Sequence, residues 1–364
     1  MPAKRIYLHI GAPKTGTTYL QALCGRNRDV LAAHGIVYPE AFGDAHHKAV
    51  WDLRETPDQR EGTKGIEGSW ERLAGLANDA DSDVLLSSEH FVFAVRRQID
   101  RAVSSFDGEL HVIYTARDLV RQVPAVWQER IKNQKTVAYH DFVRSVIDGS
   151  GPGAKSFWGA QDAGRALDRW SGSATGISPD RVHVVTAPPT GSPRTLLWDR
   201  FSSVIGLAGV EVDTSADSAA NESLSMLQTE LLRRYNERHA EGVPWPQYRR
   251  IMRRQLDVLT AIDDGRKVAL APDEHAFFSA RAREICDAVA TAGYQVVGDL
   301  ADLIPVAQRS GAGGDDPTEL SEAELLAASL DVVHQLLISQ ADAKRAARQQ
   351  SRQAARKQAR NRPS

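Results

Sequence analysis

The chain has 364 residues, of which 42% are hydrophobic and 25% are charged, the proportions of a globular protein that can bury a sizeable core. Its 45 Lys and Arg residues nearly balance 47 Asp and Glu residues, which disfavours nucleic-acid binding by the body of the protein. Two cysteines exclude a disulfide scaffold and a Cys-cluster metal site, and the apolar run before Gly11 is too short for a signal peptide or a transmembrane segment, so we expect a cytoplasmic protein.

Four short apolar runs that are rich in β-branched residues predict buried strands at 6–10, 83–88, 111–115 and 181–185. Helices are expected between them, at 18–33, 70–78, 119–133 and 164–171. Strands that alternate with helices favour right-handed crossovers and a parallel sheet. We therefore expect an α/β fold of three layers, with a central parallel sheet flanked by helices. In such folds ligands bind beyond the carboxyl ends of the strands.

The loop after the first strand has the composition of an anion-binding site. Gly11 and Gly16 have the separation of a G-x-x-x-x-G phosphate loop, but Thr17 stands where a Walker A loop has its lysine, and the lysine comes earlier, at Lys14. Backbone N–H groups at a helix start, this lysine and three threonine hydroxyls predict a cradle for one phosphate rather than for a magnesium-bound triphosphate. The alternative is an ordinary glycine turn with a solvated lysine.

Arg117 directly follows the third predicted strand. A guanidinium at the carboxyl end of a parallel strand can hold a phosphate through two hydrogen bonds. A second anion site beside the first suits a nucleotide with two separate phosphate groups. The alternative is a surface arginine paired with Asp118 or Glu129.

The segment Pro13-Lys14-Thr15-Gly16-Thr17-Thr18 resembles the P-K-[ST]-G-T-T loop of the sulfotransferases, which binds the 5′-phosphosulfate of 3′-phosphoadenosine 5′-phosphosulfate (PAPS). That family has a P-loop-like α/β fold, and a strand-end arginine and a serine eight residues on hold the 3′-phosphate. Arg117 matches the arginine, but Ala125 stands at the serine position. The candidates to replace that serine are Arg121, Gln122 and Gln128. The segment Asn221-Glu222-Ser223-Leu224 is similar to an N-x-S segment of bacterial members.

The resemblance implies a PAPS-dependent sulfotransferase in which residues 13–18 and Arg117 bind the nucleotide. Lys14 would stabilise the charge that develops on the bridging oxygen. The acceptor, a small molecule or a glycan, needs a general base. Glu89 is the first candidate and His90 the second, because they follow the second predicted strand, and Glu40 is the third. The alternative for Glu89 is a helix-capping or salt-bridged carboxylate. No metal is required by this arrangement.

Three further features can shape the acceptor side. His46 and His47 predict either a substrate-side pair or solvated side chains, and the second is favoured because adjacent histidines point in different directions. No spaced third ligand indicates zinc. The Gly-rich stretch 148–158, which ends in Phe157-Trp158, predicts either a lid or a plain surface linker. Arginines at 249, 250, 253 and 254 have helical spacing and predict a solvated helix face or, alternatively, contacts to the 3′-phosphate or to an acidic acceptor.

The C-terminal part is expected to follow a flexible linker at 307–318, which separates a body of residues 1–306 from a segment of residues 319–364. Leu326, Leu330, Val333 and Leu337 recur with the period of an amphipathic helix that packs on the body or on a second copy of the chain. Residues 344–362 hold eight basic residues and no acidic one, so the rest of the chain carries 37 − 47 = −10. This tail is expected to be a solvated helix or disordered, or else to anchor the chain to an acidic partner.

Two other functions are compatible with these patterns. A different P-loop enzyme, such as a small-molecule kinase, is disfavoured by the position of the lysine. A catalytically silent relative that serves as a binding or assembly protein through its C-terminal helix remains an alternative, and Ala125 is the feature that keeps it open.

Overall fold

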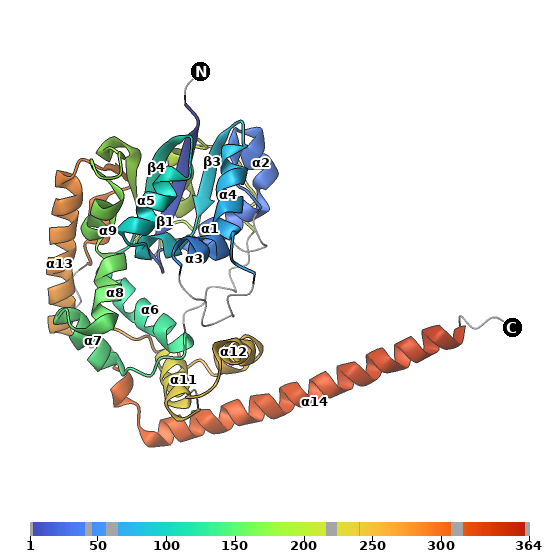
Figure 1. Cartoon of the computed structure of the whole chain (residues 1–364). Coiled ribbons are helices and arrows are strands. Elements are labelled where there is room, and N and C mark those ends of the chain that lie inside the picture. The colour runs from blue at the N-terminus through green and yellow to red at the C-terminus, as the bar shows by residue number, and fades with distance from the viewer. Residues whose placement is uncertain are drawn as a thin grey trace. The chain divides into compact units, whose positions relative to one another are not determined.

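The computed structural model describes residues 3–40, 46–55, 65–215, 224–239, 241–306 and 316–360 (Figure 1). Its internal contacts divide the chain into two compact units. The first holds Met1–Arg130, Ala138–Ser223 and Ala269–Gly314, and the second holds Ile131–Val137, Leu224–Val268 and Asp315–Ser364. The expected linker falls largely outside the described residues, and the division into residues 1–306 and 319–364 stays a prediction.

The first unit is built on one sheet of six parallel strands in the order β2-β3-β1-β4-β5-β6. The strands are β1 (Arg5–Gly11), β2 (Ile36–Val37), β3 (Asp83–Ser87), β4 (Glu109–Ala116), β5 (Val182–Thr186) and β6 (Gln295–Val297). The four predicted strands and the predicted parallel α/β class are confirmed. The edge strands β2 and β6 were not predicted.

Helices flank this sheet, as predicted (Figure 1). The helices of the first unit are α1 (Thr17–Arg26), α2 (Arg28–Ala33), α3 (His47–Leu53), α4 (Ser69–Asn78), α5 (Arg96–Ser104), α6 (Leu119–Lys132, whose last two residues belong to the second unit), α7 (Tyr139–Ile147), α8 (Gly151–Gln161), α9 (Ala163–Trp170), α10 (Leu196–Val204) and α13 (Pro272–Thr291). The 3₁₀ segment η1 (Glu89–Phe93) follows β3. The predicted helices at 70–78, 119–133 and 164–171 are confirmed as α4, α6 and α9.

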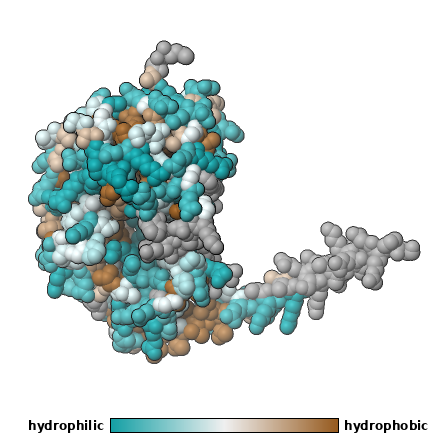
Figure 2. Space-filling view, in the orientation of Figure 1, coloured by the Kyte–Doolittle hydropathy of each residue, from teal (hydrophilic) through white to brown (hydrophobic). Residues whose placement is uncertain are grey.

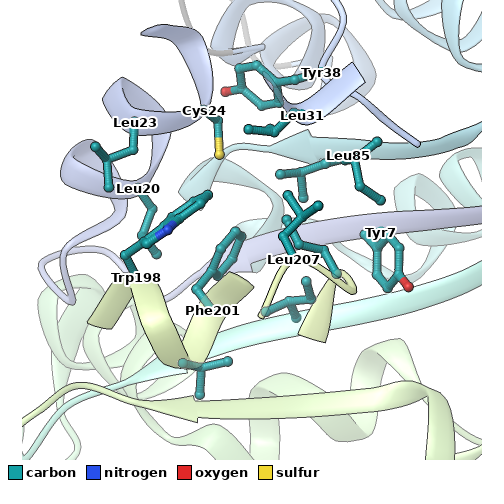
Figure 3. Close-up of a cluster of buried hydrophobic side chains, with 14 of the residues drawn as sticks. Tyr7, Leu20, Leu23, Cys24, Leu31, Tyr38, Leu85, Trp198, Phe201 and Leu207 are labelled. Carbon is teal, nitrogen blue, oxygen red and sulfur yellow. The ribbon is translucent and has the colours of Figure 1, made fainter. Parts of the chain in front are cut away.

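One face of the sheet packs against α1, α2 and α10 (Figure 3). Tyr7 of β1 and Leu85 of β3 are register partners and lie on this face. They pack with Leu20 from α1 and with Trp198 and Phe201 from α10. Complete burial of one such apolar side chain contributes about 2 kcal/mol. This core fixes α1, and with it the loop between β1 and α1.

A chain of aromatic rings fixes the segment after β3. Phe91 of η1 lies edge-on between Trp70 of α4, at 6.0 Å between ring centroids, and Trp170 of α9, at 5.9 Å. All three side chains are buried. Edge-to-face contacts of this kind add to the energy of area burial. The residues just before Phe91 are therefore held on a rigid support.

The predicted helix at 18–33 is two helices, α1 and α2, that meet at Asn27. Its side-chain Nδ2 donates to the Leu23 carbonyl at 2.9 Å, and its Oδ1 accepts from the Asp213 backbone N–H at 2.8 Å. A side chain that bonds to nearby backbone groups competes with the regular helix. The periodicity of the apolar residues does not reveal this break.

The second unit contains α11 (Met226–His239), α12 (Trp245–Thr260) and α14 (Glu322–Arg360). Helix α14 confirms the predicted C-terminal helix and contacts α11 and α12. Its inward-facing residues are Leu325 and Ala328, which are buried, whereas the predicted packing stripe of Leu326, Leu330, Val333 and Leu337 is exposed. The prediction was that this helix packs on the body or on a second copy of the chain. Its contacts with α11 and α12 are contacts with the predicted body, but Leu325 and Ala328 are the buried residues rather than the stripe. No helix in the described ranges has the length and apolarity needed to span a membrane.

Candidate functional site

Three loops meet at the carboxyl ends of β1, β3 and β4, because β1 lies between the other two strands. The Ala12 N–H donates to the Thr115 carbonyl at 2.8 Å, and the Ser88 N–H donates to the His9 carbonyl at 3.0 Å. Gly11 has a φ of +97°, and a Cβ there would stand 2.9 Å from the Cβ of Glu89. Only glycine therefore allows the first and second loops to approach this closely.

The loop after β1 has the backbone of an anion cradle. Lys14 has a φ of 68° and Gly16 a φ of 98°, and left-handed residues in such a turn aim successive N–H groups toward one point. Gly16 is the N-cap residue directly before α1, and no side chain caps the helix. The N–H groups of the first helical turn, with the positive end of the helix dipole, are thus offered to an external anion.

The threonines of the loop differ in their surroundings. The Thr15 hydroxyl donates to the Ala12 carbonyl at 2.6 Å and also contacts the Thr115 hydroxyl, so it supports the loop from below. Thr17 is buried and Thr18 is exposed. Of the three predicted hydroxyl donors, Thr15 forms hydrogen bonds that stabilise the loop, which leaves the hydroxyls of Thr17 and Thr18 for a ligand.

A polar network lies beneath the loop and crosses three strands. His9 of β1 is fully buried, with Nδ1 2.8 Å from the Ser87 hydroxyl and Nε2 3.4 Å from the Thr115 hydroxyl. Burial lowers the pKa of His9 to about 4, so the imidazole is neutral at neutral pH. The network continues through Thr15 into the loop, which ties the cradle to the sheet.

Two buried histidines, His9 and His46, predict that the protein loses stability in mild acid. Burial also lowers the pKa of His46 to about 4, while in the unfolded chain both imidazoles titrate near 6.5. Between these values the unfolded state binds more protons, so the unfolding free energy falls as pH drops from about 6.5 to 4, by about 3 kcal/mol per histidine. We expect urea denaturation across this range to show it. The slope of the unfolding free energy against pH should be smaller in His9→Gln than in the wild type, and it should be unchanged in the exposed control His34→Gln. Equal slopes in the wild type and both variants would contradict this.

Arg117 is half-buried, and its guanidinium donates to the Lys14 carbonyl at 3.2 Å. Burial and the neighbouring charge of Arg121 lower its pKa to about 10, although Asp118 opposes the shift. Within the described residues it has no carboxylate within ion-pair distance; Asp118 pairs with Arg121, and Glu129 pairs with Lys14. The alternative of a surface pair with Asp118 or Glu129 is thus absent there. A half-buried cation that makes no ion pair among the described residues, beside the cradle, is a candidate phosphate ligand.

The Lys14 ammonium lies 2.7 Å from a carboxylate oxygen of Glu129, which belongs to α6. Both side chains are partly exposed, at 35% and 42%. An ion pair of this kind contributes about 0–1 kcal/mol. A bound anion in the cradle can therefore draw Lys14 away from Glu129 at little cost.

The proposed replacements for the family serine already have partners. The Arg121 guanidinium donates to Asp118 and to the Pro188 carbonyl, and the Gln122 amide donates to the Pro13 carbonyl at 3.0 Å. Gln128 is buried in α6. Ala125 is partly exposed on the same helix. The Gln122 amide fixes the cradle rather than reaching toward a ligand, and the identity of the replacement stays a prediction.

Glu89 lies in a cluster with two imidazoles. The Gln21 amide of α1 donates to Glu89 Oε2 at 2.9 Å, and one ligand atom from each of His47, Glu89 and His90 lies within 4.8 Å of the others. Burial alone raises the pKa of Glu89, but the charges of His47 and His90 and the hydrogen bond from Gln21 outweigh it, so its pKa lies below the ordinary value. The carboxylate is therefore ionised and able to accept a proton.

The prediction that His46 and His47 are solvated is wrong. His46 is buried, with Nε2 2.9 Å from the Pro39 carbonyl, and its Nδ1 accepts from the Ser87 N–H at 3.0 Å. His47 is the first residue of α3, and its Nδ1 lies 2.9 Å from the Ser88 hydroxyl. The two do point in different directions, one into the core and one toward Glu89. No local spacing reveals this, because 42 residues separate His47 from Glu89.

A carboxylate beside two imidazoles can act as a general base or hold a zinc-type ion. His47, Glu89 and His90 are the described residues that could hold a metal, and the prediction that no metal is required stays a prediction. Glu40, the third candidate base, is exposed and has no hydrogen-bond or ion-pair partner among the described residues. The geometry favours Glu89 over Glu40, because Glu89 adjoins the cradle.

The predicted lid at 148–158 is wrong. The stretch forms the start of α8, because Ala154, Phe157 and Trp158 bury one face of that helix. The Trp158 indole donates to the Val146 carbonyl at 2.8 Å. This part of the chain also lines an open surface pocket of about 570 Å³ between α8 and α13, which contains none of the cradle residues. Burial of the aromatic rings outweighs the low helix propensity of the Gly-Pro-Gly start.

Two sequence predictions fall outside the first unit or outside the described residues. The arginines at 249 and 250 lie on α12 of the second unit, where Arg250 is exposed, and the side chains at 253 and 254 are outside the described residues. Residues 221–223 of the N-x-S segment are also outside the described residues.

Comparison of the chain with models of protein families, with curated proteins and with solved structures finds no match. What the geometry establishes is a parallel α/β fold of the kind that binds nucleotides, with a candidate anion site at the carboxyl ends of its central strands.

Proposed function

We propose that this protein is a PAPS-dependent sulfotransferase. The observation that carries the proposal is the position of Arg117, a half-buried guanidinium without a carboxylate partner in the described chain, hydrogen-bonded to the loop that begins α1. Two anion-binding groups that adjoin in this way suit a nucleotide with a phosphate at each of two positions.

The residues present fit such a nucleotide. The uncapped N–H groups at the start of α1 and the hydroxyls of Thr17 and Thr18 would hold the 5′-phosphosulfate. Arg117 would hold the 3′-phosphate. Lys14 would leave Glu129 and approach the bridging oxygen. Pro13 serves the loop through its carbonyl, which accepts from the side-chain amides of Gln122 and Gln161.

The chemistry assigned to the chain is alignment, charge neutralisation and proton removal. Glu89 takes the proton from an acceptor hydroxyl or amine as that atom forms a bond to sulfur. The bond between sulfur and the bridging oxygen breaks, and Lys14 neutralises the negative charge left on that oxygen. The products are the sulfated acceptor and adenosine 3′,5′-bisphosphate. His90, the second candidate base, lies in the same cluster as Glu89.

Ligand binding tests the proposal directly. Adenosine 3′,5′-bisphosphate should raise the thermal unfolding midpoint by several degrees, because a ligand at 100 times its Kd stabilises the folded state by about 2.7 kcal/mol. Added EDTA should leave the shift unchanged. No shift at millimolar ligand would contradict the proposal, and turnover of Mg²⁺-ATP would point to a kinase instead. Binding without turnover of any acceptor would favour the silent binding protein.

Glu89→Gln is expected to reduce turnover by a factor of about 10²–10⁴, because loss of a general base has an effect of that size. The affinity for adenosine 3′,5′-bisphosphate should be unchanged, since the amide keeps the shape of the side chain and can still accept from Gln21. Steady-state kinetics and calorimetric titration measure the two quantities. His90→Gln is the matched variant: a larger loss there than in Glu89→Gln would transfer the role of base to His90.

A further inference from the structure

Helix α14 carries a band of exposed apolar side chains. Of the ten exposed large hydrophobic residues in the described chain, five lie between residues 326 and 338. They are Leu326 at 63% exposure, Leu330 at 61%, Val333 at 50%, Leu337 at 61% and Ile338 at 43%. Figure 2 shows brown, hydrophobic surface along the first part of this helix. Clustered apolar exposure of this kind marks an interaction surface rather than scattered surface residues.

The band is separate from the face that α14 uses within its own unit. Leu325 and Ala328 are buried where the helix contacts α11 and α12. Ion pairs from Arg234 to Glu322, at 2.8 Å, and from Arg266 to Glu324, at 3.0 Å, hold this face in place. The apolar band therefore faces away from the fold of the second unit, on a helix whose orientation is already fixed.

The spacing of the band is that of a coiled-coil seam. Leu326, Leu330, Val333 and Leu337 are separated by four, three and four residues, the alternation of a heptad repeat that two facing helices share. The seam spans only about two heptads, and Gln340 and Lys344 occupy the next positions. A partner of matching length is required, rather than a long fibrous coil.

The charges on either side of the seam identify the partner. The exposed Glu319 precedes it, while Glu322 and Glu324 are already paired with Arg234 and Arg266. The basic residues Lys344, Arg345 and Arg348 follow it, with Asp342 beside Arg345. A second α14 in parallel orientation would bring acid against acid and base against base. In antiparallel orientation, with Leu326 opposite Leu337, Glu319 of each copy lies opposite Lys344 of the other, and the two basic segments are kept apart, which is favourable.

We propose that two copies of this chain associate through their α14 helices in antiparallel orientation. Leu326 of one copy then faces Leu337 of its partner, and Leu330 faces Val333. The contact is self-complementary about a two-fold axis, as closed dimers require. This association is independent of the sulfotransferase chemistry proposed above.

The oligomeric state of the full chain tests the proposal. Sedimentation equilibrium at micromolar concentration should give twice the mass of one 39.9 kDa chain. Leu330→Lys and Val333→Lys should shift the mass to one chain, while Ser339→Lys, which adds the same charge at an exposed position outside the seam, should remain dimeric. Unchanged circular dichroism would show that the variants still fold. A monomeric wild-type chain, or variants that stay dimeric, would overturn the proposal.

Cross-linking tests the orientation. A mixture of Leu326→Cys chains and Leu337→Cys chains should form a disulfide between the two kinds of chain under mild oxidation. Neither variant alone should do so, because an antiparallel pair places like positions far apart. The native Cys24 and Cys286 are buried, and the wild-type chain, which carries only these two cysteines, gives the background level of cross-linking. Efficient cross-linking within each single variant would show a parallel pair and overturn the proposed orientation.

Discussion

Arg117→Ala is expected to abolish detectable sulfuryl transfer, mainly by weakening nucleotide binding. The guanidinium is desolvated and, among the described residues, has no ion-pair partner, so its charge is available to a phosphate. Hydrogen bonds to charged groups contribute about 1.5–3 kcal/mol each. Loss of the two hydrogen bonds from the guanidinium to the 3′-phosphate, about 3–6 kcal/mol together, should therefore raise the Kd of adenosine 3′,5′-bisphosphate by at least about 100-fold. Isothermal titration calorimetry measures this.

Two further variants separate the charge of Arg117 from its shape. Arg117→Lys keeps the charge but loses the planar fork, so its affinity should lie between those of the wild type and Arg117→Ala. Arg165→Ala removes a guanidinium on α9 that pairs with Asp162 instead, and it should bind the nucleotide normally. Equal affinity in Arg117→Ala and the wild type would remove the basis of the proposed function.

The parts of the fold that follow from local sequence were predictable. The four long strands have continuous apolar runs, because each is covered on both faces. The cradle at Gly11–Gly16 is also a local feature, since its two glycines and its lysine lie within six consecutive residues. Short elements lack such a signature: β2 has two residues and β6 has three, and their pairing depends on the neighbouring strand rather than on their own composition.

The candidate site could be predicted only in part. Lys14, Glu89 and Arg117 were found because each follows a strand, and parallel strands bring such residues to one edge of the sheet. His47 is named in the sequence analysis only as one of two adjacent histidines, and its place beside Glu89 is not predicted, because it reaches the site from α3, across 42 residues of sequence. The pairing of Lys14 with Glu129 also depends on tertiary structure, since α6 must pack beside the cradle.

The structure also differs from the sequence prediction in α8 and α14, and in both cases the burial of apolar side chains is the reason. Gly151 and Pro152 predict a loop on propensity alone, but Phe157 and Trp158 bury their rings, and the packing of one helical face stabilises α8. In α14 the apolar period predicted the helix but not its buried face. Leu325 and Ala328 are inward, one or two positions from the exposed seam, and only the contacts with α11 and α12 distinguish the two faces.

Lys14→Ala is expected to slow the chemical step by a factor of about 10²–10³, the usual effect of removing one group that stabilises a developing negative charge. Nucleotide affinity should change far less, because the N–H groups of α1 and the Arg117 guanidinium remain. In this structure the lysine is paired with Glu129, and that pair is weak. The substitution therefore removes little ground-state stabilisation, and its effect should appear in kcat rather than in the dissociation constant.

Glu129→Gln provides the complementary test. It releases Lys14 from its present partner without altering the cradle, so kcat should be retained or should rise by up to about fivefold, in line with a pair that contributes about 0–1 kcal/mol. If Lys14 instead acts only by positioning α6 through Glu129, the two substitutions should have the same effect on kcat. A large loss of kcat in Lys14→Ala, with kcat retained or raised in Glu129→Gln, is what a lysine that stabilises the transition state requires, because only the first variant loses the cation.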